Sequence, residues 1–155
     1  MLSVEIYADG ACINTTKIGG WAYRIMYSGK LVIKRSGHTE NVTNNIMEMA
    51  AVLEGLKKYE TLEGEYRSCP LYVYTDSAYV ANAFNEGWIQ KWKDNGWINS
   101  QKMPVKNKDI WEELDIIMHR NGALIKRTPR NDKNIMLVDI RAREVAKKRN
   151  LEIQT

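Results

Sequence analysis

Four acidic side chains in this sequence stand where they could build a metal site. Asp9 and Asp76 each come directly after a run of residues with the pattern of a β-strand. Because ligands collect beyond the strand ends of open α/β sheets, these two carboxylates are expected to converge there. Glu48 lies beside the apolar stripe of a predicted helix that can aim it at the same strand ends, and Asp139 is predicted to open the C-terminal helix.

Such a cluster would need a cation, because gathered carboxylates repel and raise the pKa of their neighbours. Mg²⁺ prefers oxygen ligands, and two such ions about 3.5–4 Å apart can activate a water and stabilise the leaving oxygen of a phosphodiester. The sequence has no cluster of histidines and cysteines that would hold zinc instead. Spacing alone leaves ordinary roles open: a turn at Asp9–Gly10, a helix cap at Asp76, a solvated Glu48, and a helix-dipole partner at Asp139.

The elements that must position these carboxylates begin with an antiparallel meander. Alternating apolar and polar residues predict strands at Val4–Ala8, Trp21–Tyr27 and Leu31–Arg35. Gly19-Gly20 is predicted to form a turn, and Ser28-Gly29 has the composition of a two-residue hairpin loop. Asp9 would then close the first strand.

Helical periodicity follows the meander. A helix is predicted to start at Thr43-Asn44, where a short polar side chain can cap free amides. The later elements are a buried strand at Leu71–Thr75, weak helical stretches at Ala78–Phe84 and Trp88–Lys93, an amphipathic helix through Ile110 and Met118, a strand at Ala123–Lys126 and a basic C-terminal helix. The expected architecture is one α/β domain over residues 1–155, with helices on a mixed five-stranded sheet in the order βββαβααβα.

Composition excludes several classes of protein. With 155 residues, of which 44% are hydrophobic and 27% charged, the chain can bury a full core and is not a disordered segment. No apolar run approaches the roughly 20 residues of a membrane span, and the N-terminus lacks the pattern of a signal peptide. Cys12 and Cys69 form no disulfide scaffold, which favours a reducing cytoplasm. An excess of seven positive charges between residues 120 and 149 favours a polyanionic partner, although a solvated helix face would carry the same charges.

Four longer motifs follow one another along the chain. The first strand and its continuation read IYADGACIN and GGWAY, and the first helix begins within VTNNIMEMAAVLEGLK. The strand-to-helix junction reads YVYTDSAYV, and a basic, tryptophan-rich segment reads GWIQKWKDNGWINSQKMPVKNKDIWEEL. In this order the motifs resemble the type 1 ribonuclease H family, ribonuclease HI, from about Val4 to Lys148. The resemblance implies the ribonuclease H-like fold and a basic handle over about residues 86–109.

The resemblance also implies a role for each residue that matches a family motif. Asp9, Glu48, Asp76 and Asp139 match the metal-binding carboxylates, which implies catalysis with two Mg²⁺ ions, or with Mn²⁺ in their place. The residues at substrate-binding positions are Cys12, Asn14 (or its neighbour Thr15), Thr43, Asn44, Asn45, Trp88, Lys91, Trp92 and Trp111. Amide side chains suit the shallow minor groove of an RNA/DNA hybrid, and a tryptophan wall suits tracking of the DNA backbone. Packing within the handle is the alternative role of the tryptophans.

The chain departs from the family pattern in the loop after the last strand. This loop reads KRTPRNDKNIMLVD and lacks the family's histidine, so Arg130 or Lys133 is predicted to steady the scissile phosphate. Ala78 and Lys91 replace a glutamine and an asparagine that contact substrate in the family. The only histidines, His38 and His119, are expected to be structural or solvent-exposed.

The resemblance therefore implies an endonuclease that hydrolyses the RNA strand of an RNA/DNA hybrid and leaves 5′-phosphate and 3′-hydroxyl ends. We expect a cytoplasmic monomer. The alternatives are a junction resolvase, the nuclease portion of a reverse transcriptase, and a non-catalytic hybrid-binding module. The handle and the TNN helix start argue against the first two, and the four intact carboxylates argue against the third.

Overall fold

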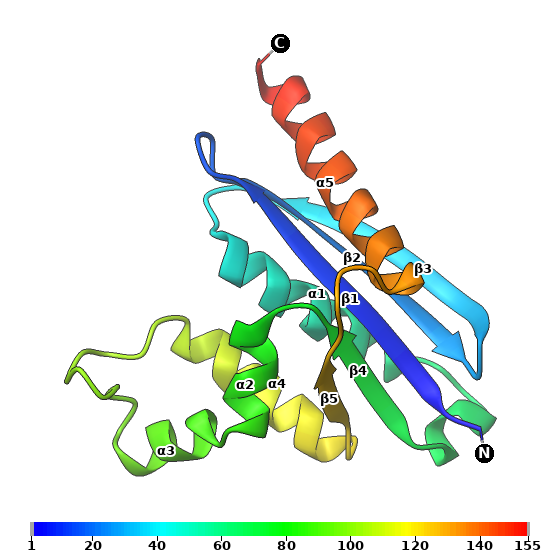
Figure 1. Ribbon diagram of the computed structural model, residues 1–155, viewed down its shortest axis with the longest axis horizontal. Coiled ribbons are helices and arrows are strands. Elements are labelled where there is room, and N and C mark those ends of the chain that lie inside the picture. The colour runs from blue at the N-terminus through cyan, green and yellow to red at the C-terminus, as the bar shows by residue number, and fades with distance from the viewer. Residues whose placement is uncertain (1, 155) are drawn as a thin grey trace.

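The computed structural model describes residues 2–154, and its central element is a mixed five-stranded sheet with the strand order β3-β2-β1-β4-β5. The strands are β1 (Val4–Ile13), β2 (Ile18–Tyr27), β3 (Lys30–Thr39), β4 (Leu71–Thr75) and β5 (Leu124–Arg127). The helices are α1 (Asn44–Tyr59), the 3₁₀ helix η1 (Glu65–Ser68), α2 (Ala78–Asn85), α3 (Trp88–Asp94), α4 (Lys108–Arg120) and α5 (Lys133–Gln154). In Figure 1, α1 and α4 lie behind the sheet and α5 crosses its front. This architecture confirms the predicted α/β fold class.

The first three strands form the predicted antiparallel meander, and each is longer than predicted. The hairpin at Ser28-Gly29 is confirmed, with left-handed φ angles of 45° and 89° at its two residues. The predicted turn at Gly19-Gly20 is wrong, because both glycines lie in β2 and the connection from β1 falls at residues 14–17. A Cβ atom at Gly20 would collide with the backbone of Ala142, so this glycine allows α5 to approach the strand closely.

The strands β4 and β5 extend the sheet in parallel with β1. The ladder between β1 and β4 ends at Tyr7 and Tyr74, while β4 and β5 remain paired to Thr75 and Arg127. Three helices rather than two connect β4 to β5, so the observed order of strands and α-helices is βββαβαααβα. The weak helical stretches are separate helices, because Gly87, with φ of 72°, divides α2 from α3.

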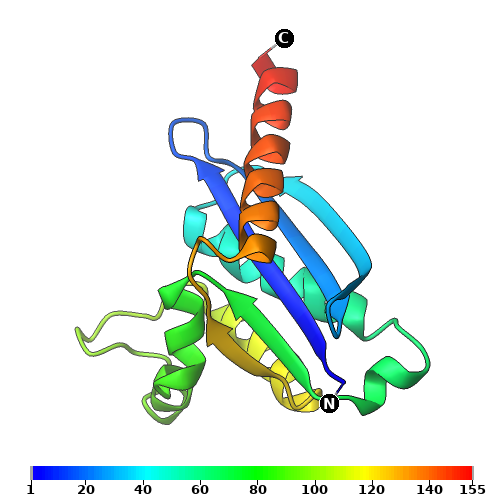
Figure 2. The same cartoon turned by 45° about the vertical axis from the view of Figure 1, so that its right-hand side comes forward.

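The main core lies between the sheet and the layer of α1 and α4. Its largest fully buried side chains include Trp111, Ile6, Ile25, Met49, Leu56 and Leu114. The other face of the sheet is covered by α5 through the small cluster of Ala22, Val138 and Ala142. Figure 2 shows that α5 covers β1 and β2 and continues beyond the sheet.

The C-terminal helix begins earlier than predicted, at Lys133 rather than at Asp139. Asp132 Oδ1 accepts hydrogen bonds from the backbone amides of Asn134 and Ile135 at 2.9 and 3.0 Å, so this side chain caps α5. Asp139 therefore lies in the second turn, where a role as partner of the helix dipole does not apply. Within residues 2–154, no helix is both long enough and apolar enough to cross a membrane.

Candidate active site

Asp9 lies in the middle of β1 and not at its end, because the strand continues through Gly10 to Ile13 along β2. A Cβ atom at residue 10 would collide with the backbone of Met47, so Gly10 lets the start of α1 pack directly against the strand. The Asp9 side chain is buried, and its Oδ1 accepts a hydrogen bond from the Gly10 amide at 2.9 Å. The alternative of a turn at Asp9–Gly10 is therefore wrong.

Asp76 follows β4 directly, as predicted. The alternative role for Asp76, capping the next helix, is taken by Ser77 instead. Ser77 Oγ accepts a hydrogen bond from the Val80 amide at 3.1 Å and caps α2, which leaves the Asp76 carboxylate to face a cavity. The Asp76 side chain is 9% exposed, and its Oδ2 lies 3.2 Å from Arg130 Nε. Its buried Oδ1 has no hydrogen-bond partner. A buried oxygen without a partner is costly, so this atom marks a position that a bound cation would satisfy.

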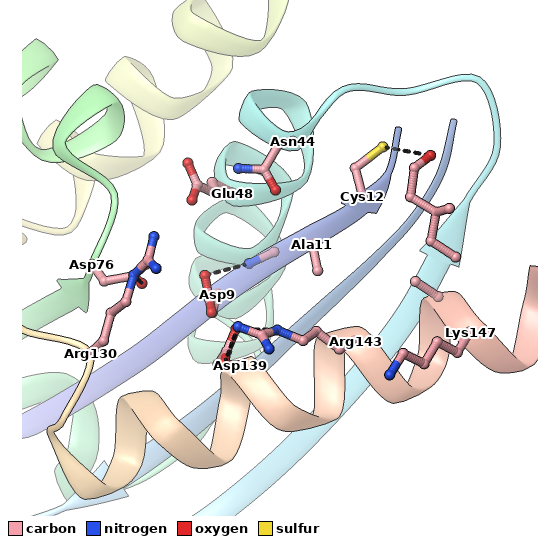
Figure 3. Close-up of a pocket in the computed structure, with 13 residues that line it drawn as sticks. Asp9, Ala11, Cys12, Asn44, Glu48, Asp76, Arg130, Asp139, Arg143 and Lys147 are labelled. Carbon is pink, nitrogen blue, oxygen red and sulfur yellow. Dashed lines mark hydrogen bonds and ion pairs between the residues drawn. The ribbon is translucent and has the colours of Figure 1, made fainter. Parts of the chain in front are cut away.

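Glu48 reaches the same cavity from the second turn of α1. The helix start is set by Thr43, whose Oγ1 accepts a hydrogen bond from the Ile46 amide at 3.2 Å. Carboxylate oxygens of Asp9, Glu48 and Asp76 all lie within 4.8 Å of one another. Figure 3 shows these side chains converging from β1, α1 and the end of β4. The structure thus brings together the three carboxylates that the sequence placed at strand ends and on the first helix.

Asp139 approaches this cluster from α5, across β1 from α1 (Figure 3). It shares a hydrogen bond with Asp9 and forms an ion pair with Arg143, whose Nε and Nη2 lie 3.1 and 3.0 Å from its two oxygens. Arg143 and Lys147 also line the cavity, although no motif in the sequence pointed to them. Their spacing of four and eight residues from Asp139, which places them on one helix face, is the signal that could have found them.

Burial and mutual repulsion raise the pKa of two of these carboxyl groups. Desolvation, the charge of Asp76 and the hydrogen bond with Asp139 raise the pKa of Asp9 to about 9. Burial also raises the pKa of Glu48, and hydrogen bonds with Ser77 and Asn44 oppose this shift. Metal-free Asp9 therefore holds a proton at neutral pH, and a cation in the cavity would favour its ionised form.

The cavity fits a divalent cation that prefers oxygen ligands. It has a volume of about 320 Å³, and its lining supplies carboxylates from the middle of β1, the end of β4 and two helices, including the unpartnered Oδ1 of Asp76. No histidine of the described chain lines it, and the thiol of Cys12 donates to the Val42 carbonyl at 3.4 Å. Carboxylate oxygens are the donors that Mg²⁺ and Mn²⁺ prefer, so the residues present fit either ion.

The loop between β5 and α5 brings Arg130 to the cavity but not Lys133. The Arg130 side chain is 86% exposed and reaches back to Asp76 (Figure 3). Lys133 is the first residue of α5 and lies outside the lining of the cavity. Of the two residues predicted to steady the scissile phosphate, only Arg130 is therefore in a position to do so.

The residues that match substrate-binding positions divide between two cavities. Cys12 and Asn44 line the carboxylate cavity. Thr43 and Asn45 line a second cavity of about 580 Å³. It is also lined by Tyr79, Trp92 and the handle residues Asn99, Gln101, Met103, Pro104, Val105, Lys106 and Asn107. Asn14 lies in the exposed turn after β1 and belongs to neither lining. Since Asn44 and Asn45 are adjacent, the start of α1 stands between the two cavities.

The handle tryptophans differ in burial. Trp88 and Trp92 are half-buried, with ring centroids 6.3 Å apart, and Trp92 lines the second cavity. Trp111 is fully buried, and its Nε1 donates to the Tyr79 hydroxyl at 3.3 Å. The prediction that Trp111 belongs to a substrate-facing wall is therefore wrong. Its ring packs in the main core against Tyr79 and also against Trp92 of the handle, which is the alternative role of packing.

The handle lysines also differ. Lys93 on α3 forms an ion pair with Asp115, a nearly buried residue of α4, and so fastens the handle helix to the body. The exposed handle lysines, which form no ion pair within the described residues, are Lys91, Lys102, Lys106 and Lys108.

The sheet and the cluster together define an α/β domain whose central strands and first helix carry carboxylates that could hold a metal ion. The family model for RNase H matches residues 1–128, which include Asp9, Glu48 and Asp76 but end before Asp139. Ribonuclease H of Caldanaerobacter subterraneus subsp. tengcongensis is 50% identical over 113 residues, 72% of this chain and 68% of that protein. Ribonuclease HI of Neisseria meningitidis serogroup B is 42% identical over 119 residues, 77% of each chain.

A solved structure agrees with this fold. LC11-RNase H1 in complex with an RNA/DNA hybrid superposes with a TM-score of 0.70 and 18% identity, covering 94% of this chain and 98% of that one. The chain belongs to the RNase H family. It is an enzyme of the ribonuclease H type, as its motifs predicted.

Proposed function

We propose that this enzyme cleaves the RNA strand of RNA/DNA hybrids internally and leaves 5′-phosphate and 3′-hydroxyl ends. The observation that carries the proposal is the convergence of Asp9, Glu48 and Asp76 within 4.8 Å, with one buried oxygen of Asp76 unpartnered. The hybrid in the LC11-RNase H1 complex supports the choice of substrate. Because the cavity is complete within one chain, we also infer a monomer, which light scattering would test.

Asp9, Glu48 and Asp76 would hold the catalytic cations, with Asp139 joining them from α5. When bound, two Mg²⁺ ions, or Mn²⁺ in their place, supply charge neutralisation, activation of a water and stabilisation of the leaving oxygen. Asp9 has to give up its proton before it can serve as a ligand, because its pKa is raised to about 9 in the metal-free protein. Arg143 holds Asp139 in position beside Asp9.

Arg130 would bind the scissile phosphate in this chain, which lacks a histidine in that loop. A guanidinium is always charged, so Arg130 can stabilise negative charge on the phosphate but cannot carry a proton. Its contact with Asp76 keeps the guanidinium beside the carboxylates until substrate arrives.

The start of α1 would separate the two strands of the hybrid. Asn44 and Cys12 face the carboxylate cavity, where the RNA strand would lie, and Asn45 and Thr43 face the second cavity. Amide groups at this place can contact the minor groove, where 2′-hydroxyls distinguish RNA from DNA. Trp92 and the exposed handle lysines would hold the DNA backbone.

A cleavage assay tests the proposal. End-labelled RNA/DNA hybrid, duplex DNA, duplex RNA and a four-way junction are incubated with the protein, with and without Mg²⁺. We expect internal cleavage of the RNA strand of the hybrid, only with metal, and products that a 5′-phosphate-dependent ligase accepts. Cleavage of the junction instead would indicate a resolvase, and binding without cleavage would indicate a hybrid-binding module.

A further inference from the structure

A basic cavity lies on the flank of α5 that faces away from the carboxylates. It has a volume of about 530 Å³ and lies between α5 and the outer strands β2 and β3. Its cationic lining residues are Arg24, Lys34, Arg35 and Arg141, Ser36 and Leu137 also line it, and no acidic residue belongs to its lining. Figures 1 and 2 show β3 extending beyond α5, and we call the cavity between them the α5–β3 trough.

The trough exists because small residues bring α5 close to β2 while β3 is polar on the same face. Gly20 and Ala22 lie against Ala142, which leaves little distance between α5 and β2. On β3, Ser36 pairs with Ala22 and Lys34 pairs with Arg24. No apolar side chain of β3 lines the trough, so the space beside α5 stays open.

Like charges face one another inside this trough. Arg24 and Lys34 are direct cross-strand partners, and like charges directly opposite on a sheet are destabilising. Neither residue belongs to an ion pair among the described residues. Arg141 adds a further cation from α5, and its contact with Glu144 at 3.6 Å joins two side chains that are more than half exposed. The positive charge of the trough is thus largely uncompensated, and a bound anion would relieve the repulsion.

Neutral partners orient the two arginines. Arg24 Nε donates to Asn134 Oδ1 at 3.3 Å, and Arg141 Nε donates to Ser36 Oγ at 3.1 Å. Both hydrogen bonds use only Nε, so both Nη groups of Arg24 and Nη2 of Arg141 remain as donors, while Nη1 of Arg141 lies 3.6 Å from Glu144. Terminal guanidinium nitrogens held in a fixed orientation are suited to binding the oxygens of a phosphate.

We propose that the α5–β3 trough is a second binding site, which takes the phosphates of a nucleic-acid strand outside the cleaved duplex. Its volume lies within the range of about 300–1,000 Å³ that is usual for ligand sites. Only α5, with a diameter of about 10–12 Å, separates the trough from the carboxylate cavity, so one strand can reach both. A free polyphosphate offers the same chemistry and is the other source of such a ligand. None of the four cationic residues of the trough lines the carboxylate cavity, so the proposal is independent of the proposed reaction.

The test uses single-stranded oligodeoxythymidine and inorganic tripolyphosphate as separate probes, without metal. NMR follows the Nε–Hε signals of Arg24 and Arg141, and fluorescence anisotropy measures the affinity of the strand. The double variant Arg24→Gln/Lys34→Gln removes two charges from the trough. The matched control, Lys30→Gln/Lys148→Gln, removes two charges from exposed residues of β3 and α5 outside its lining.

We expect the oligonucleotide to shift both arginine signals and to bind the double variant about tenfold more weakly. The salt slope of binding should fall by about 1.4, the value for two lost single-strand phosphate contacts, and the control should keep its slope. A response to tripolyphosphate alone would overturn the assignment to nucleic acid. No response to either probe, or an equal loss in the control, would overturn the site itself. Cleavage of a short blunt hybrid with Mg²⁺ should be unchanged in the double variant. The binding assay therefore tests the trough, and the cleavage assay tests the proposed reaction separately.

Discussion

Replacing Asp9 by asparagine should stabilise the metal-free protein at neutral pH and abolish its activity. Folding raises the pKa of Asp9 from an ordinary 3.8 to about 9. Between these values the folded state holds one proton more than the unfolded state, so stability falls by about 1.4 kcal/mol for each unit that the pH rises. At pH 7 the raised pKa of this one group lowers the free energy of unfolding by up to about 4 kcal/mol. Asparagine removes this loss, and its Oδ1 can still accept the hydrogen bond of the Gly10 amide.

Thermal unfolding in EDTA at pH 4 and pH 7 measures this effect. Recovery of half of the loss, about 2 kcal/mol, would raise Tm by about 4–8 °C in a protein of this size. We expect that rise at pH 7 and none at pH 4, where the charge of Asp9 no longer matters. The exposed Glu63 provides a matched control, because Glu63→Gln removes one charge outside the cluster and should leave Tm unchanged.

Two results would refute this reasoning. An unchanged or lower Tm of Asp9→Asn at pH 7, or an equal rise at pH 4, would show that burial and repulsion do not destabilise ionised Asp9. Mg²⁺-dependent cleavage near the wild-type rate would show that Asp9 is not a metal ligand. Hybrid binding should survive in the variant, since the second cavity and the handle are unchanged.

Four further outcomes follow from the site and the handle. Alanine at all four exposed handle lysines should raise KM for the hybrid far more than it lowers kcat. The salt dependence of hybrid binding should weaken by about 0.9 in slope for each lost duplex contact. An unchanged KM would show that the handle only packs against the protein and does not bind substrate. Lys93→Ala should instead lower stability by about 1–3 kcal/mol, because it leaves the nearly buried Asp115 with only the exposed His119 as a partner, and denaturant unfolding beside Lys91→Ala checks this. Arg130→Gln should strengthen Mn²⁺ binding in calorimetry without substrate, because the guanidinium competes for a cluster carboxylate, and should weaken hybrid binding; equal Mn²⁺ affinity would contradict that competition. The pH–rate profile should lack a limb near pH ~6.5, because the loop beside the carboxylates has no histidine. A limb there that disappears when His38 or His119 is replaced by alanine would show that one of these histidines takes part in the reaction.

Several predictions that succeeded depended only on neighbouring residues in the chain. The hairpin at Ser28-Gly29, the cap at Thr43 and the strand Leu71–Thr75 follow from short-range conformational preference and hydrogen bonding. One prediction that failed depended on distant ones. Gly19-Gly20 has the composition of a turn, yet Gly20 lies in a strand, where it pairs with Ala11 and His38 and its missing side chain makes room for Ala142.

The sequence by itself determined the chemistry that this protein can perform. The four carboxylates, the asparagines at the start of α1 and the tryptophan-rich handle are readable from motifs, because residue types and their order along the chain define them. Tertiary structure decided the burial, the partners and the pKa of individual side chains. It buried Trp111, paired Lys93 with Asp115, brought Arg130 rather than Lys133 to the cavity, and raised the pKa of Asp9 to about 9. Burial and ion pairing depend on which residues meet across the fold, and packing determines those contacts where local sequence patterns do not.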